Sequence, residues 1–340
     1  MANTILTAPA LIGAVLILGP AIATYALIVV LMPVLQRYAL ARPNARSSHS
    51  QPTPQGAGIA IIVVLVGVFA LLAALSPGFE TGALIPVVAA AVILAFVGTV
   101  DDIRTLEVLP RLAIQSFAVL IVIVALPRGF QTLPFLPFWL ERAILFFGLL
   151  WFINLANFMD GIDWMTVAEV VPLAAALALF GFVGALPISE TLIALCLCGA
   201  MLGFAPLNRP IARVFLGDVG SLPIGLLLGW LLIVLAESHL TAAILLPLYY
   251  VSDATITLLR RLVKGERLMQ AHRGHFYQRA MIGGLSAYAI VGRVVLLNVV
   301  LIVLAGMTIT NNSFPLQIIA IAVGVFLVGW QLYRFEQGRT

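Results

Sequence analysis

The chain has 340 residues, of which 62% are hydrophobic and only 9% carry a charged side chain. Since a soluble domain carries about 25% charged residues, this composition excludes an ordinary soluble domain and predicts an all-α polytopic membrane protein. The net charge of +4 comes without a basic stripe interleaved with aromatic residues, so the sequence predicts no nucleic-acid binding. Cys196 and Cys198 lie in one apolar run, which does not indicate a disulfide framework.

Eleven apolar runs predict about eleven transmembrane helices in a single integral membrane domain that covers residues 1–340. Most runs approach the roughly 17–25 residues that cross a bilayer. We expect the first to be a retained helix and not a signal peptide, because no basic residue precedes it. In chain order the predicted helices cover 11–35, 57–75, 82–100, 112–126, 138–156, 165–184, 190–206, 221–236, 241–259, 285–308 and 315–333.

Lysine and arginine residues predict how these helices are oriented. When the connecting loops alternate between two sides, fifteen of the eighteen basic residues fall on one side and two on the other. An excess of basic residues marks the cytoplasmic side of a membrane protein. The same side receives every loop that contains clustered acidic residues, so we expect the site to face the cytoplasm.

The connection between the first two predicted helices is polar. Arg42, Arg46 and His49, with Ser47 and Ser48 between them, supply hydrogen-bond donors in a segment that proline and glycine keep non-helical. These donors suit an anionic substrate, and a plain linker explains them equally well.

Asp101 and Asp102 close the third apolar run. The C-terminal end of a helix disfavours negative charge, so the pair predicts a compensating cation, either a divalent metal or a basic substrate. An interfacial charged cap at the end of a span is the structural alternative.

Polar residues recur every three positions after the fifth apolar run, at Asn154, Asn157, Asp160 and Asp163. This spacing places them on one face if the helix continues, although Asp160-Gly161 predicts a turn. In either case two amides and two carboxylates converge, which favours a functional site over a simple turn.

Asp218 precedes another apolar run. Asp218, Gly220 and Ser221 would cap the following helix in the structural alternative. The same segment offers backbone N–H groups and the positive end of a helix dipole to a phosphate. Beside the other aspartates it favours a metal–diphosphate site.

The longest polar loop contains His272, Arg273, His275 and Arg279. These residues suit a phosphate or a leaving group better than zinc, since a structural zinc site needs four nitrogen or sulfur ligands and no cysteine is near. A solvated loop attracted to anionic lipid is the alternative.

Taken together, these clusters predict an enzyme in which a nucleotide-activated or diphosphate substrate meets a lipid. Mg²⁺ would bridge phosphate oxygens, and arginine and histidine would offset the remaining negative charge. The rival class is a polytopic transporter with acidic residues at helix ends, for which charges in the middle of spans would be typical. Apart from Glu141, Arg142 and Glu190 near the starts of two spans, only Glu169, Asp253 and Arg293 fall inside predicted spans.

Four motifs resemble the polyprenyl-phosphate N-acetylhexosamine-1-phosphate transferases, of the glycosyltransferase family 4 type. They are DD at 101–102, NxxNxxDGxD at 154–163, FxGDxGSxxxG at 215–225 and HxxH at 272–275. The segments RSSHSxPTPxGxG and HRGHFYQR look more like the O-antigen-initiating branch than the phospho-N-acetylmuramoyl-pentapeptide transferases. HRGH lacks the three consecutive histidines of the peptidoglycan enzyme, and Gln55 and Ala57 replace an expected arginine and glycine.

The resemblance implies Mg²⁺-dependent transfer of N-acetylhexosamine 1-phosphate from a UDP-N-acetylhexosamine to undecaprenyl phosphate, with release of UMP. It implies a multi-pass protein of the bacterial inner membrane, allows Mn²⁺ in place of Mg²⁺, and allows a homodimer. A lipid phosphate is already ionised near neutral pH, so direct attack is favoured over a covalent aspartyl intermediate.

The predicted site residues fall into three groups, which share some members. The catalytic residues are Asp101, Asp102, Asp160, Asp218, His272 and His275. The metal ligands are Asp102, Asp160 and Asp218. The substrate-binding residues are Asn154, Asn157, Asp163, Arg46, His49, Arg111, Arg273, Gly217 and Ser221.

Overall fold

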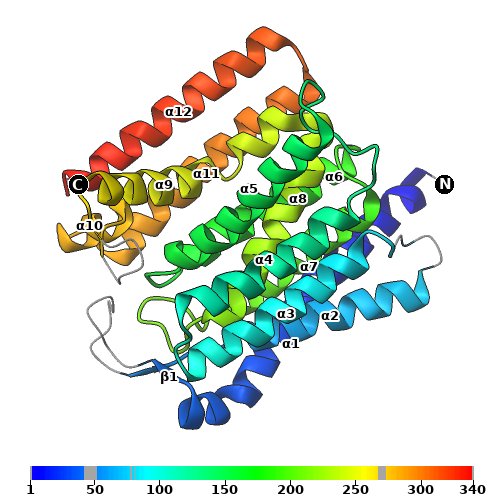
Figure 1. Cartoon of the computed structure of the whole chain (residues 1–340). Helices are drawn as coiled ribbons and strands as arrows, with labels where there is room; N and C mark the ends of the chain where they lie inside the picture. The colour runs from blue at the N-terminus through cyan, green and yellow to red at the C-terminus, as the bar shows by residue number, and fades with distance from the viewer. Residues whose placement is uncertain (1, 42–51, 77–78, 80, 267–272, 339–340) are drawn as a thin grey trace.

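The computed structural model describes residues 2–41, 52–76, 79, 81–266 and 273–338. Over these residues the chain forms long helices and one pair of two-residue antiparallel strands (Figure 1). The strands are β1 (Leu40–Ala41) and β2 (Thr53–Pro54). The helices are α1 (Ala2–Tyr38), α2 (Gly58–Leu75), α3 (Leu84–Ile103), α4 (Val108–Ala125), α5 (Phe138–Met159), α6 (Met165–Phe182), α7 (Ile188–Phe204), α8 (Asp218–Leu245), α9 (Leu248–Val263), α10 (Phe276–Ile282), α11 (Ala287–Thr310) and α12 (Phe314–Glu336).

The predicted all-α polytopic membrane fold is confirmed. Within the described chain, nine helices are long and apolar enough to cross a membrane, namely α1 to α6, α8, α11 and α12. A further apolar helix, α7, is shorter. Large apolar side chains such as Phe96, Phe147 and Phe326 are exposed on these helices, as expected for surfaces that contact lipid.

The predicted eighth and ninth crossings have different boundaries in the structure. Helix α8 runs to Leu245, but the backbone of His239 inside it is non-helical (φ −136°, ψ 58°). After this kink, Thr241 donates to Gln317 near the start of α12 (3.2 Å), and Arg260 pairs with Glu336 at the end of α12 (2.9 Å). The chain from Thr241 to Arg260 therefore contacts α12 near both of its ends, and the break at His239 falls between the two predicted crossings.

Helix α8 is the central helix of the bundle. Nineteen of its 28 residues are buried, and it packs against α3, α5 and α11. Its first turn touches α2 and α3 through glycines: a Cβ on Gly58 would lie 2.2 Å from the Cα of Gly220, and one on Gly98 would lie 2.4 Å from the carbonyl carbon of Asp218. Since small residues let helix backbones approach closely in membranes, these glycines fix the start of α8 against its neighbours.

A second pair of glycines joins α7 to α1. Gly199 and Gly203 form a G-x-x-x-G motif, and a Cβ on either would lie 2.2 Å from a carbonyl oxygen of α1, that of Ile17 or of Ala21. Close packing of this kind replaces the hydrophobic driving force that is missing between helices in lipid.

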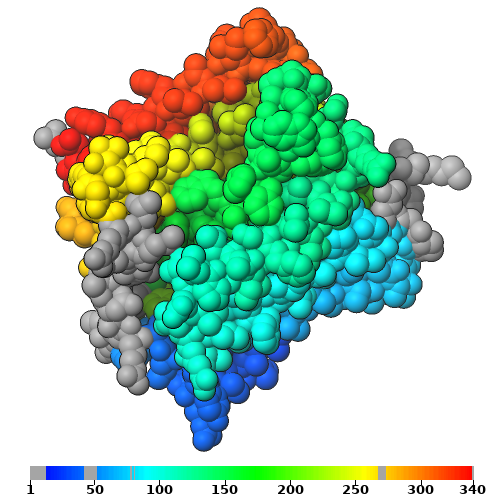
Figure 2. Space-filling model, in the orientation of Figure 1, coloured from blue at the N-terminus to red at the C-terminus, as the bar shows by residue number. Residues whose placement is uncertain are grey.

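One face of the molecule has a recessed middle. In Figure 2 the green surface of α5 lies set back between the teal surface of α4 and the yellow surface of α9. The C-terminal half of α5 and the start of α4, which border this recess, carry several of the predicted site residues.

Candidate functional site

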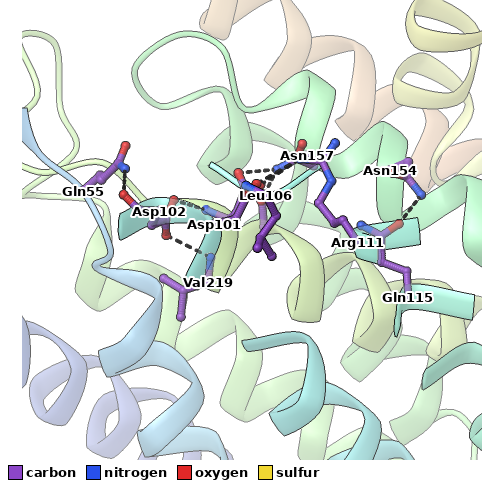
Figure 3. A network of polar contacts seen from close by, with 11 residues as sticks. Gln55, Asp101, Asp102, Leu106, Arg111, Gln115, Asn154, Asn157 and Val219 are labelled. Atoms are coloured by element: carbon purple, nitrogen blue, oxygen red, sulfur yellow. Dashed lines mark hydrogen bonds and ion pairs between the residues drawn. The ribbon is translucent and has the colours of Figure 1, made fainter. Parts of the chain in front are cut away.

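A polar cluster forms at one end of the bundle, where α3 and α5 end and α4 and α8 begin (Figure 3). The guanidinium of Arg111, in the first turn of α4, lies between two carboxylates. Its Nη1 is 2.9 Å from Asp101 Oδ2 and 3.5 Å from Asp218 Oδ2. Three of the predicted residues, from three helices, thus meet as a group in which a guanidinium lies between two carboxylates.

Asn157 holds the opposite side of Asp218. Its Nδ2 donates to Asp218 Oδ1 (2.7 Å) and to Ser221 Oγ (2.9 Å), which joins the end of α5 to the first turn of α8. The side chain of Asp218 is therefore fixed by an amide on one oxygen and a guanidinium on the other, and the predicted convergence of Asn157, Asp218 and Ser221 is seen.

The polar contacts continue into the bundle below this cluster. Asn154 donates to Gln115 Oε1 (2.9 Å) and to the carbonyl oxygen of Leu150 (2.8 Å). Gln115 lies one helical turn after Arg111 and is buried. Gln115 is not among the residues predicted from the sequence. A lone amide in the apolar run of α4 was nevertheless a signal, since polar groups inside a membrane are costly and are usually functional.

The Asp160–Asp163 segment is a turn and not a continuation of α5. Thr166 donates its hydroxyl to Asp160, and Asp163 Oδ2 accepts from the amide of Ala212 (3.0 Å). Burial raises the pKa of Asp160 to about 6; the Thr166 hydrogen bond opposes this increase and the charge of Asp163 adds to it. Gly161 is needed because a Cβ there would lie 2.1 Å from Tyr277 Oη.

Trp164 joins this turn to the α7–α8 loop. Its backbone has φ +65°, which is unusual for an aromatic residue and marks a constrained position. The amide of Trp164 donates to Asn208 Oδ1 (2.8 Å) and its indole Nε1 donates to the carbonyl oxygen of Ala205 (2.6 Å). Trp164 and Asn208 are not among the residues predicted from the sequence, because no local motif reveals contacts across more than forty residues.

His275 lies in a separate buried cluster organised by Asp253. Asp253 Oδ1 is 3.2 Å from His275 Nδ1, and the two carboxylate oxygens accept from the amides of Phe276 and Tyr277. The His275 side chain is only 3% exposed and stacks on Tyr277. Tyr277 in turn donates to the carbonyl oxygen of Phe158, so the cluster supports the end of α5.

Protein encloses the ring of His275. Its role beside a diphosphate therefore stays a prediction. Arg273 is exposed, and Arg279 pairs with Glu336 (2.7 Å), which also binds Arg260. The predicted residues Arg46, His49 and His272 lie outside the described residues.

The oxygen ligands of the polar cluster suit Mg²⁺. Asp101 and Asp218 already share one positively charged group, and carboxylate and amide oxygens are hard ligands. Within the described part of the chain, no three acidic, histidine or cysteine side chains surround one metal position. This set still fits Mg²⁺, which usually takes one or two carboxylates and completes its shell with water and substrate phosphates.

Comparison with known proteins places this cluster inside a family domain. The model of glycosyl transferase family 4 matches residues 84–236. A protein of Bacillus subtilis (strain 168) named probable undecaprenyl-phosphate N-acetylglucosaminyl 1-phosphate transferase is 25% identical over 318 residues, which are 88% of this chain and 85% of the relative.

Two further relatives match over shorter regions. The decaprenyl-phosphate N-acetylglucosaminephosphotransferase of Mycolicibacterium smegmatis is 33% identical over 56% of this chain and 52% of its own. The phospho-N-acetylmuramoyl-pentapeptide-transferase of Streptococcus agalactiae is 30% identical over 55% of this chain and 60% of its own. The match to each of these two relatives therefore spans little more than half of the relative's length.

Residues 84–236 contain Asp101, Arg111, Asn157 and Asp218 of the polar cluster, and also the Asp160–Asp163 turn. The surrounding helices form the apolar bundle of a membrane protein. The chain is therefore a membrane protein whose residues 84–236 are similar to glycosyl transferase family 4.

Proposed function

We propose that this chain transfers N-acetylhexosamine 1-phosphate from a UDP-sugar to undecaprenyl phosphate and releases UMP. The observation that carries the proposal is the position of the Asp101–Arg111–Asp218 group, which lies at the end of a membrane-spanning bundle inside the family domain. The names of the Bacillus and Mycolicibacterium relatives, which specify a polyprenyl phosphate and N-acetylglucosamine, support the acceptor and the sugar class.

The reaction is a displacement at phosphorus. An oxygen of the lipid phosphate forms a bond to the phosphorus that bears the sugar, and the bond between that phosphorus and the oxygen of UMP breaks. UMP leaves with the bonding electron pair as a phosphate monoester, and the product is a lipid diphosphate sugar. Since the second pKa of a phosphate monoester is about 6, the attacking oxygen needs no protein base near neutral pH.

The residues of the cluster would act by holding charge in place. Arg111 offers a guanidinium to the phosphate oxygens, and Asn157 keeps Asp218 in one orientation. Asp218 and Asp101 would hold Mg²⁺, which when bound neutralises the diphosphate and stabilises the leaving phosphate. The carboxylate of Asp160 would complete the negative side of the site.

The proposed site lies on the cytoplasmic side of a bacterial inner membrane. Fifteen basic residues in the loops on the side of the site, against two on the other, support this orientation. We propose N-acetylglucosamine as the first sugar to test, and initiation of a surface glycan such as O-antigen as the role. The HRGH segment differs from the histidine run of the peptidoglycan enzymes, which makes a muramoyl-pentapeptide donor the second choice.

The proposal is tested by transfer of radiolabel from a panel of UDP-sugars to a butanol-extractable lipid. Purified protein, undecaprenyl phosphate and Mg²⁺ should give labelled lipid with UDP-N-acetylglucosamine or one of its 6-deoxy or 4-epimeric relatives. EDTA and Asp218→Ala should each remove the product. Labelled lipid formed at an unchanged rate by Asp218→Ala would rule out the proposed site.

A further inference from the structure

We propose that Asp102 is a positioning residue, which caps the first turn of α8 from the neighbouring helix α3 and so fixes the direction of Asp218. The inference rests on the proposed function. It gives Asp102 a different role from the catalytic and metal-binding roles expected from the sequence. It also gives Asp102 a different role from that of its neighbour Asp101.

Both carboxylate oxygens of Asp102 are bound by backbone amides of α8. The amide of Asp218 donates to Oδ1 (3.0 Å) and the amide of Val219 donates to Oδ2 (3.1 Å) (Figure 3). The first amides of a helix have no partner within the helix, and a carboxylate beside them also gains from the helix dipole. The residue at the N-cap position of α8 is Gly217, which has no side chain to do this.

The backbone around Asp102 is shaped for this contact. Gly217 has φ +77°, and a Cβ on it would lie 2.4 Å from Asp102 Oδ2. Gln55 donates to the carbonyl oxygen of Asp102 (2.8 Å), which ties the end of α3 to the segment after β2. One turn earlier, Gly98 lets the backbone of α3 approach that of Asp218. Three independent features thus hold Asp102 against the start of α8.

This arrangement separates the roles of the two adjacent aspartates. Asp101 turns its carboxylate to Arg111, whereas Asp102 turns its own to the amide nitrogens of Asp218 and Val219. By holding the amide of Asp218, Asp102 determines where the Asp218 side chain meets Asn157 and Arg111. Asp102 therefore acts through Asp218 and not on substrate.

The role is tested with the full-length protein in detergent. Asp102→Asn keeps the shape of the side chain but offers only one acceptor oxygen, so one amide of α8 loses its partner. We expect the melting temperature in EDTA to fall, since a cap is lost even without metal. We expect kcat for UMP release to fall about tenfold, which corresponds to about 1.4 kcal/mol of activation free energy. Mn²⁺ affinity, measured by electron paramagnetic resonance, should stay within about threefold of wild type, because a positioning residue does not bind the metal. A threefold change corresponds to less than 1 kcal/mol of binding free energy.

Two further variants make the comparison decisive. Asp218→Asn should remove Mn²⁺ binding. Gly217→Ala, which pushes a methyl group towards Asp102 without changing any acid, should reproduce the lower melting temperature and kcat while retaining Mn²⁺. The pH profile of Asp102→Asn should keep the wild-type shape.

The inference is overturned if Asp102→Asn loses Mn²⁺ binding as completely as Asp218→Asn, or if it removes a limb of the wild-type pH profile. The first result would make Asp102 a metal ligand and the second would make it a base. Absence of UMP release from wild-type protein would instead count against the proposed function, and the melting and Mn²⁺ comparisons would still report on Asp102.

Discussion

Arg111 is the side chain on which the charges of the site converge. It contacts carboxylates from α3 and α8, and it is about one-fifth exposed, so it can also meet a ligand. Because hydrogen bonds to charged groups contribute about 1.5–3 kcal/mol, Arg111→Ala should lower kcat/KM for UMP release about tenfold to hundredfold. Arg111→Lys should recover part of the loss, since it keeps the charge but not the planar fork.

The matched control for this change is Arg128→Gln, an exposed arginine before α5 at the other end of the bundle. Its kcat/KM should match that of wild type. Equal losses in Arg111→Ala and Arg128→Gln would indicate a general effect of positive charge and would remove Arg111 from the site.

Asp160 should give the proposed site a pH dependence. Burial raises the pKa of Asp160 to about 6, so its working carboxylate form is lost as the pH falls through that value. UMP release should decline on this acid side. Thr166→Val removes the hydrogen bond that opposes the increase, so the acid limb should move to higher pH. A limb that moves to lower pH in Thr166→Val, or does not move, would contradict the assignment of the limb to Asp160.

At the scale of elements, the contact between α3 and α8 depends on glycine. Gly98→Ala would place a methyl group against the backbone of Asp218 and Val219, and the two helices would have to separate. Overpacking of this kind costs about 1–3 kcal/mol. We expect a lower melting temperature together with lower transferase activity, measured on the same purified sample.

Gly67→Ala, in the neighbouring helix α2, is the control. No atom lies within 4 Å of the position that its Cβ would take, and alanine favours a helix over glycine. The melting temperature should be unchanged or slightly higher. A loss in Gly67→Ala as large as that in Gly98→Ala would show that the close approach of α3 to α8 is not the cause.

The elements themselves could be predicted from the sequence, because each crossing is an apolar run of characteristic length. The turn at Asp160-Gly161 and the convergence of Asn157, Asp218 and Ser221 also follow from motifs in the sequence. The break at His239 also follows from the sequence, because Glu237, Ser238 and His239 separate the predicted helices 221–236 and 241–259. The use of Asp102 as a cap for α8 could not be predicted, because it depends on how two helices more than a hundred residues apart meet.

At the scale of the whole molecule, the proposed cytoplasmic orientation predicts which positions a membrane-impermeant maleimide reaches. Arg209→Cys, in the exposed α7–α8 loop, should react only in inside-out vesicles. Arg128→Cys should react in intact spheroplasts. The native Cys196 and Cys198 are buried and should give little background. The reverse labelling pattern would place the site outside the cytoplasm and would contradict use of a UDP-sugar from within the cell.

The central claim is that a sugar and its phosphate leave UMP together and join a lipid phosphate at the Arg111 cluster. The most direct measurement uses UDP-N-acetylglucosamine labelled at the sugar-bound phosphorus, with purified protein, undecaprenyl phosphate and Mg²⁺. We predict that the label moves into the lipid fraction in step with release of unlabelled UMP, and that Asp218→Asn abolishes both. Label that stays in a nucleotide product, or transfer that is unaffected by Asp218→Asn, would contradict the account.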